Sequence, residues 1–268
     1  VPAAGREIIG KACESLDYFL AEYGEDGCCD EGAQYYRHAG LTLFNAMEVL
    51  NDVCGGIFGE LYKEKKIANM ADYIRRVHVA GPYYVNFADC SPKAGPCRAR
   101  EYLFGKRTGN GKLMAFAAED YRRCGDKLDL QEHNLMYRVQ AAFAHEEMTE
   151  YGNGWGEEKA GESQRGEDWY FPSAGLFIAR DERFCLAVKA GDNGDSHNHN
   201  DVGSFTVYCD GRPLFIDVGV ESYTKKTFSP ERYEIWTMQS RYHNLPTFGG
   251  VMERDGKQFG AGQVEYEL

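Results

Sequence analysis

The sequence has no long hydrophobic run and no excess of positive charge, and each absence excludes a class of protein. No apolar stretch approaches the roughly 18 to 20 residues that a membrane-spanning helix needs. Lysine and arginine total 30 against 42 aspartate and glutamate residues, which gives a formal net charge of -12. This balance disfavours a broad electrostatic contact with nucleic acid or an anionic bilayer. We therefore expect neither a nucleic-acid partner nor a membrane partner.

A regular cysteine pattern is also absent. The nine cysteines are scattered and include no C-x-x-C pair, so neither a disulfide framework nor a thiolate zinc site is indicated. Reduced thiols favour a cytoplasmic location. The chain begins without an initiator methionine or a signal segment, and residues 264–268 resemble a strand cut short. We expect a fragment truncated at one or both ends, whose oligomeric state the sequence does not indicate.

The first 150 residues are predicted to be helical. The 268-residue chain is 43% hydrophobic and 27% charged, which is typical of a globular protein with ample material for a core. Apolar residues recur at helical spacing, as in Leu41, Phe44, Met47 and Leu50 before the Gly55-Gly56 stop. The expected helical segments lie at 9–23, 41–50, 61–77, 112–123 and 131–146.

The pattern changes to strands after a polar, glycine-rich stretch at 151–168, which is typical of a linker or surface loop. Asp210-Gly211 is a strong hairpin signal between two of the later strands. The expected strands lie at 174–180, 184–190, 203–209 and 213–218. The chain is thus expected to have an α-helical part (1–150), a linker (151–168) and an antiparallel β part (169–268).

The densest polar cluster, Gly194 to Asp201, precedes a predicted strand. His197 and His199 project to one side if the backbone is extended, and neutral imidazole is the commonest protein metal ligand. Asp217 ends an apolar run that is expected to be a buried strand, where an ionised carboxylate needs a cation or several donors, and His243 follows. Two histidines and a carboxylate suit zinc.

The spacing alone does not choose the ligands. His199, Asp201 and His243 also match the facial triad of non-haem Fe(II) oxygenases. A lone histidine would usually be an ordinary surface residue, but these polar residues occur within about fifty positions of one another. A metal site is therefore favoured, with its carboxylate ligand left open between Asp201 and Asp217.

A second cluster starts the predicted helix near residue 35. Tyr35, Arg37 and His38 cannot all lie on the core side of one helix, so some of them face solvent or a cleft. A tyrosine becomes chemically useful where a cation or a metal-backed histidine lowers its pKa toward working pH. The aromatic segment 81–89 is interpreted as an interhelical loop that packs its own rings.

These segments resemble the heparinase II/III-like polysaccharide lyases. The matching residues are 196–219, followed by 236–244 with His243. Residues 171–180 look like the strand that opens the family's β-sandwich. Asp26-Gly27 to Tyr35 looks like the family's D-G-x-x-x-E-G-x-x-Y helix start.

The resemblance implies an α+β multidomain fold, in which part of an N-terminal (α/α) toroid packs against a C-terminal antiparallel β-sandwich and the active site lies between them. It also implies a structural zinc ion held by His199, Asp217 and His243, with His197 free to face the substrate. Tyr35 matches the catalytic tyrosine. Tyr223 and Tyr233 are candidates for a second tyrosine that some members use as a base.

The family also neutralises the substrate carboxylate with an Asn or His roughly fifty residues before the tyrosine. Only 34 residues precede Tyr35, so we expect this group to belong to an N-terminal part outside the sequence or to be lost. The resemblance implies β-elimination from a uronic-acid glycan, with His197 as base and Tyr35 as acid. Residues near the cleft expected to bind this anionic polysaccharide are Glu31, Arg37, His38, Arg232 and Arg241.

Two other functions stay open. A non-catalytic carbohydrate-binding homologue would keep the fold without the chemistry. An Fe(II) oxygenase would use His199, Asp201 and His243 as metal ligands. Its fold would be a jelly roll, which needs no helical partner, so the helical first part of the chain weighs against it. The acidic total charge does not exclude an anionic substrate, because exposed charges beyond about 8 Å are largely screened at physiological salt. Local cations near the cleft therefore matter more than the net charge.

Overall fold

The computed structural model describes residues 3–124, 132–154 and 167–267, which form two compact units. The helical unit consists of the described residues in 1–27, 37–75 and 96–163. The sheet unit consists of those in 28–36, 76–95 and 164–268. Two segments of the first 150 residues therefore pack with the strands. The expected linker falls mostly on 155–166, which lie outside the described residues.

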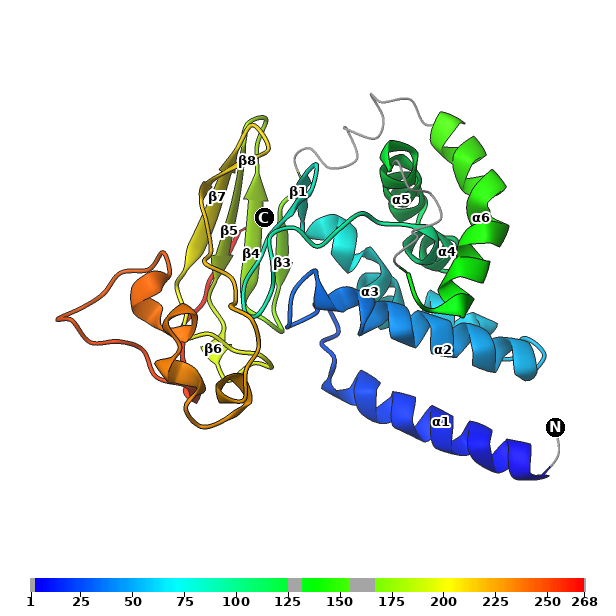
Figure 1. Cartoon of the computed structure of the whole chain (residues 1–268), viewed down its shortest axis with the longest axis horizontal. Helices are drawn as coiled ribbons and strands as arrows, with labels where there is room; N and C mark the ends of the chain where they lie inside the picture. Colours follow the sequence, from blue (N-terminus) through cyan, green and yellow to red (C-terminus); the bar gives the residue numbers. More distant parts are fainter. Residues whose placement is uncertain (1–2, 125–131, 155–166, 268) are drawn as a thin grey trace. The chain divides into compact units, whose positions relative to one another are not determined.

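The helical unit contains the five helices that the sequence predicts and one that it does not (Figure 1). The predicted ones are α1 (Ala3–Glu22), α2 (Gly40–Val53), α3 (Lys65–Arg76), α5 (Gly111–Arg123) and α6 (Leu135–Gly154). The additional helix, α4 (Ala99–Thr108), packs against α5 and α6. A short 3-10 helix, η2 (Gly59–Lys63), precedes α3.

Local signals explain the α4–α5 corner. Gly109 ends α4 in the left-handed region at φ +69°, which glycine adopts without a Cβ penalty. Asn110 then caps α5, because its side-chain oxygen accepts a hydrogen bond from the Leu113 N–H. The core beside this corner is aromatic, with the rings of Phe44 and Phe104 stacked 4.9 Å apart.

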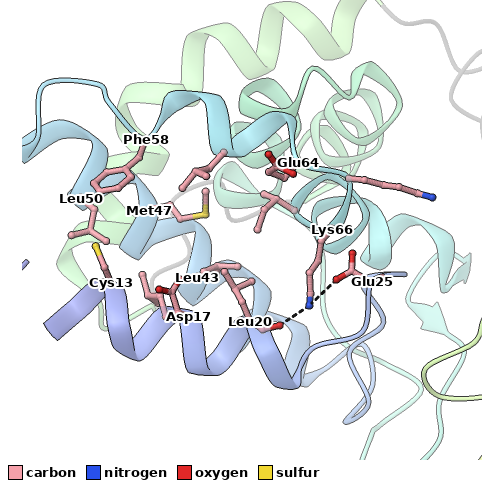
Figure 2. Close-up of a pocket in the computed structure, with 14 residues that line it drawn as sticks. Cys13, Asp17, Leu20, Glu25, Leu43, Met47, Leu50, Phe58, Glu64 and Lys66 are labelled. Carbon is pink, nitrogen blue, oxygen red and sulfur yellow. Dashed lines mark hydrogen bonds and ion pairs between the residues drawn. The ribbon is translucent and has the colours of Figure 1, made fainter. Parts of the chain in front are cut away.

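An apolar pocket of about 450 Å³ lies between α1, α2 and α3 (Figure 2). Leu20 of α1 and Leu43 and Met47 of α2 line it. Lys66 lies at one end, where its Nζ donates to the Leu20 carbonyl at 2.6 Å and lies 3.3 Å from a Glu25 carboxylate oxygen.

The sheet unit is built on a five-stranded antiparallel sheet in the order β3-β4-β5-β7-β8 (Figure 1). Its strands are β3 (Trp169–Phe171), β4 (Leu176–Arg180), β5 (Phe184–Lys189), β7 (Phe205–Cys209) and β8 (Arg212–Phe215). Two small antiparallel pairs flank it: β1 (His78–Ala80) with β2 (Tyr83–Tyr84), and β6 (Asp192–Asn193) with β9 (Gly256–Gly260). The four predicted strands are confirmed. Each is shorter than expected, and β8 begins one residue earlier.

One face of the sheet is buried, because successive side chains along each strand alternate between its two faces. Ile178 on β4 pairs with Ala187 on β5, which pairs with Thr206 on β7, and all three are buried. Lys189 occupies the same face of β5, two positions further along. The β1–β2 hairpin attaches to the sheet where the Tyr208 hydroxyl donates to the Tyr84 carbonyl at 3.2 Å.

The predicted hairpin turn is confirmed, but the strand after it is not buried. Asp210 and Gly211 both have positive φ, at +49° and +74°, as a type I′ turn requires. The apolar run that precedes Asp217 was expected to be buried, and this is wrong: Leu214 is 58% and Ile216 57% exposed. Leu214 and Phe215 of this run lie in β8, an edge strand of the sheet. Asp217 follows the run and is itself buried.

Within the described residues, no helix is both long enough and apolar enough to cross a membrane.

Candidate acid–base and metal site

The segment that carries Tyr35 belongs to the sheet unit and approaches the loop at 86–91. Gly32 allows the approach: its φ is +89°, and a Cβ there would lie 2.6 Å from the Cys90 Cβ. Gln34 continues the contact, because its N–H points at the Cys90 sulfur at 3.4 Å and its side-chain oxygen accepts from the Ser91 N–H at 3.1 Å. Tyr35 follows directly, at the start of the 3-10 helix η1 (Tyr35–Arg37).

Asp89 is the centre of the site. Its side chain is fully buried, and both carboxylate oxygens accept hydrogen bonds from residues far away in the sequence. Oδ1 lies 2.9 Å from His199 Nε2 and accepts from Arg232 Nη2 at 2.8 Å. Oδ2 lies 2.8 Å from His197 Nδ1 and accepts from the Tyr223 hydroxyl at 3.1 Å. Burial opposes ionisation, but the donors and the Arg232 charge hold the pKa of Asp89 below its ordinary value.

Two residues at this contact have left-handed backbones. His197 has φ +52°, and Ala88, which precedes Asp89, has φ +53°. Non-glycine residues rarely adopt this region, and such strain is concentrated at functional sites. The side chains of His197 and His199 were expected to point to one side because an extended backbone was expected. The backbone at His197 is not extended, yet both rings contact the same carboxylate.

Two phenols complete the acid–base cluster. The Tyr35 and Tyr223 hydroxyls are hydrogen-bonded to each other, and the Tyr35 and His197 rings lie 5.4 Å apart. Burial raises the pKa of Tyr35, and the nearby acidic groups Asp89 and Glu31 add to this, although the Tyr223 hydrogen bond lowers it. Burial, with Tyr35 and Asp89, also raises the pKa of Tyr223. The sequence-based condition of a lowered tyrosine pKa is therefore not met, and both phenols hold their protons at neutral pH.

A buried group of potential metal ligands lies beside this cluster. His199, Asp217 and His243 each offer a ligand atom, and these atoms lie within 4.8 Å of one another. The Asp217 carboxylate lies 2.8 Å from His243 Nδ1 and accepts from the Gly219 N–H at 2.7 Å. Burial opposes ionisation of Asp217, but His243, His199 and the Gly219 N–H together lower its pKa.

The donor set fits a borderline metal such as zinc. His199 Nδ1 is buried without a hydrogen-bond partner in the described residues, while Nε2 of the same ring is held by Asp89. His243 Nε2 faces the Thr237 carbonyl at 3.0 Å, which leaves Nδ1 toward Asp217. Each imidazole thus has an outer acceptor on one nitrogen and faces the cluster with the other, as metal-binding histidines usually do. Two nitrogens and one carboxylate match the ligand types of zinc.

Other predicted ligands and bases lie elsewhere in the sheet unit. The Asp201 carboxylate is paired with Lys189 Nζ at 2.9 Å and is not among the three converging residues. Tyr233 contacts Asn198, whose amide donates to its hydroxyl at 3.4 Å. Of the two candidate second tyrosines, the structure therefore brings Tyr223 to Tyr35.

Glu31, Arg232 and Arg241, three of the residues expected to bind substrate, have different surroundings. A Glu31 carboxylate oxygen lies 3.6 Å from His197 Nε2, on the ring edge opposite Asp89. Arg232 is buried and also donates to the Asn198 and Thr227 carbonyls. Its expected role in substrate binding stays a prediction. Arg241 is exposed, with Nε 3.0 Å from the Met252 sulfur.

Arg37 and His38 belong to the helical unit, whereas Tyr35 belongs to the sheet unit. Arg37 Nε donates to a Glu101 carboxylate oxygen at 3.3 Å, and its Nη2 donates to the Pro96 carbonyl at 2.6 Å. The side chain of His38 is exposed. Their expected role in substrate binding stays a prediction.

Sequence reasoning missed the role of Asp89. The segment 81–89 was expected to pack aromatic rings, and the ring centroids of Tyr83 and Tyr208 do lie 6.1 Å apart. The available signal was a pair of polar residues, Asn86 and Asp89, in an otherwise apolar stretch. Both are buried, and the Asn86 amide donates to Asp217 Oδ1 at 3.4 Å.

These observations define a mixed helical and antiparallel-sheet protein with a phenol–imidazole acid–base cluster next to a potential metal site. Residues 163–263 match the family described as Heparinase II/III-like, C-terminal. No curated protein matches the sequence.

The fold is similar to solved heparinase III structures. One with methylated lysines has a TM-score of 0.53 and 20% identity, over 90% of this chain and 33% of that chain. A crystal structure of heparinase III has a TM-score of 0.54 and 18% identity, over 94% of this chain and 36% of that chain. The chain thus spans about a third of the length of these proteins.

Proposed function

We propose that the protein is part of a polysaccharide lyase that cleaves a uronic-acid-containing glycan by β-elimination. The observation that carries the proposal is the convergence of Tyr35, Tyr223 and His197 around one buried carboxylate, Asp89. The family match and the heparinase III likeness support a lyase at the family level. Because the chain spans about a third of those structures, the activity of the whole protein is part of this proposal.

The chemistry divides between an imidazole and a phenol. Elimination removes the proton at C5 of the uronate, expels the sugar at O4 and leaves a double bond between C4 and C5. His197 accepts the C5 proton at Nε2, since its Nδ1 is occupied by Asp89. Tyr35 donates its proton to O4, and its raised pKa keeps that proton in place until the transition state. A raised pKa makes Tyr223 a poor base at neutral pH. We therefore assign it the role of orienting Tyr35, to which it is hydrogen-bonded.

His199, Asp217 and His243 would hold a structural zinc ion. When bound, zinc supplies a buried positive charge that ties together the segments carrying these ligands. His199 lies two residues from His197, so this charge would hold the loop that presents the base. The chain's own residues do the proton transfers.

The proposal extends to architecture and substrate. The helical unit would be part of an (α/α) toroid and the sheet unit an incomplete β-sandwich, with an anionic polysaccharide or oligosaccharide as substrate.

The test uses the full-length protein and a panel of uronic-acid glycans, read by the ultraviolet absorbance of the unsaturated product. Tyr35→Phe and His197→Ala should each lower kcat by at least about 100-fold, which is typical for loss of an acid or base. Tyr83→Phe is the matched control, since it removes a phenol hydroxyl from the same unit outside the cluster. Full activity in Tyr35→Phe would contradict the acid assignment. Glycan binding by the wild type without any product would instead support a non-catalytic homologue.

A further inference from the structure

The four hydrogen bonds to Asp89 are divided evenly between its two oxygens. Oδ1 accepts from His199 and Arg232, and Oδ2 accepts from His197 and Tyr223. An ionised carboxylate only accepts hydrogen bonds, so each group that faces it must supply the hydrogen. The positive charge of Arg232, whose Nη2 donates to Oδ1, favours the ionised form of Asp89.

This requirement fixes the tautomer of both histidines. Neutral imidazole carries one N–H, which His197 must place at Nδ1 and His199 at Nε2 to donate to Asp89. The lone pairs are then at the other nitrogens. For His197 this is Nε2, on the ring edge that faces Glu31, and for His199 it is Nδ1, the buried atom without a partner in the described residues.

We propose that Asp89 is a positioning residue that sets both histidines at once, so that His197 presents Nε2 as the base and His199 presents Nδ1 to the metal cluster. The part concerning the base rests on the proposed function. A single carboxylate would thus connect the metal cluster to the acid–base cluster. Asp89 also fixes the direction of the hydrogen bond between the two phenols. Because the Tyr223 hydroxyl donates to Asp89, the Tyr35 hydroxyl donates to Tyr223.

Arg232 determines which way the side-chain amide would point in the isosteric variant Asp89→Asn. In Asp89→Asn the side chain keeps one acceptor oxygen and gains an amide donor. Arg232 has no acceptor, so the Asn oxygen is expected to face Arg232 and His199, and the amide to face His197 and Tyr223. His197 must then accept at Nδ1 and carry its hydrogen at Nε2, while His199 keeps its tautomer.

The tautomers are measured by nitrogen-15 NMR of the histidine rings in the zinc-loaded full-length protein at about pH 8, where an ordinary imidazole is neutral. The chain has 7 histidines, and His197→Ala and His199→Ala assign the two signals. The wild type should show His197 with hydrogen on Nδ1. A wild-type His197 with hydrogen on Nε2 would overturn the proposal without any Asp89 variant.

In Asp89→Asn, His197 should change to the Nε2–H form while the zinc content measured by mass spectrometry stays near that of the wild type. On a glycan that the wild type cleaves, kcat should fall about 100-fold to 10,000-fold, as expected when a base has the wrong tautomer, with KM changed less than about threefold. Asp195→Asn is the matched control, because it also removes a carboxylate near the same loop. The Asp195 carboxylate is partly buried and pairs with Lys189. It should leave the His197 tautomer unchanged.

The outcomes separate this inference from the proposed function. If the wild type cleaves no uronic-acid glycan, the proposed function fails, while the ring tautomers still decide whether Asp89 sets the histidines. If Asp89→Asn keeps the wild-type tautomer of His197, or changes it and keeps full kcat, the positioning role of Asp89 is wrong even though the lyase activity stands.

Discussion

Lys189 is predicted to be the main electrostatic support of the loop that carries His197. It is 2% exposed on the core face of β5, and its Nζ lies 2.9 Å from Asp201 and 3.2 Å from Asp195. These two aspartates bracket the 195–201 loop, so one buried cation holds both of its ends. Burial opposes the charged amine, but Asp201 and Asp195 outweigh it and raise the pKa of Lys189. Lys189 therefore stays charged in the folded protein.

Lys189→Met should destabilise the sheet unit strongly. Methionine replaces the lysine stem but leaves Asp201, which is 0% exposed, as a buried charge without its cation. Breaking a buried pair in this way typically costs roughly 3–5 kcal/mol, out of a total stability of about 5–15 kcal/mol. The double variant Lys189→Met/Asp201→Asn should lose less than the single variant, since it also removes the stranded charge.

Urea unfolding followed by tryptophan fluorescence measures the effect, because Trp169 and Trp236 report on the sheet unit. The control is Lys226→Met. Its ion pair with Glu234 has a similar distance of 2.7 Å, but the two side chains are 39% and 66% exposed, so the loss should be about 0–1 kcal/mol. Equal losses for Lys189→Met and Lys226→Met, or a double variant no more stable than the single one, would refute the reasoning.

Two further predictions concern the metal and the helical unit. Asp217→Asn should lower the bound zinc measured by mass spectrometry, whereas Asp201→Asn should retain it; the reverse result would favour the oxygenase triad. Burial raises the pKa of Asp120 from 3.8 to about 6, against the hydrogen bond from the Cys97 N–H. The native state therefore binds this proton more tightly than the unfolded chain, so the Asp120 contribution is greatest below about pH 4 and falls as the pH rises to about 6. Asp120→Asn should reduce this decrease in urea-unfolding titrations, and an unchanged pH profile would contradict the assignment.

The fold was predictable where side chains repeat with a clear period. The alternation in 184–190 identified β5, and the Asp210-Gly211 turn identified the hairpin of β7 and β8. Helix α4 was missed because part of its buried face is small: Ala99 and Gly105 contribute little hydrophobicity, and a Cβ on Gly105 would lie 3.1 Å from Met114. Periodicity in hydrophobicity does not detect contacts between small residues and a neighbouring helix.

The candidate site was predictable only in part. The histidines and Asp217 were found because polar residues were concentrated at the ends of predicted strands. Asp89 was missed because its role depends on contacts with residues more than 100 positions away, such as His197 and His199. Lys189 gave a local signal, a cation at a core position of an alternating strand, whose partners only the fold reveals.

The central claim is that the cluster around Tyr35 and His197 supports elimination, and the products of cleavage test it most directly. The full-length protein would be incubated with a uronic-acid glycan in oxygen-18 water, and the fragments would be analysed by mass spectrometry. Elimination breaks the bond without adding water, so the fragment masses should sum to that of the parent and carry no solvent oxygen. Fragments that together gain one water and carry oxygen-18 would contradict the account, because they would show hydrolysis.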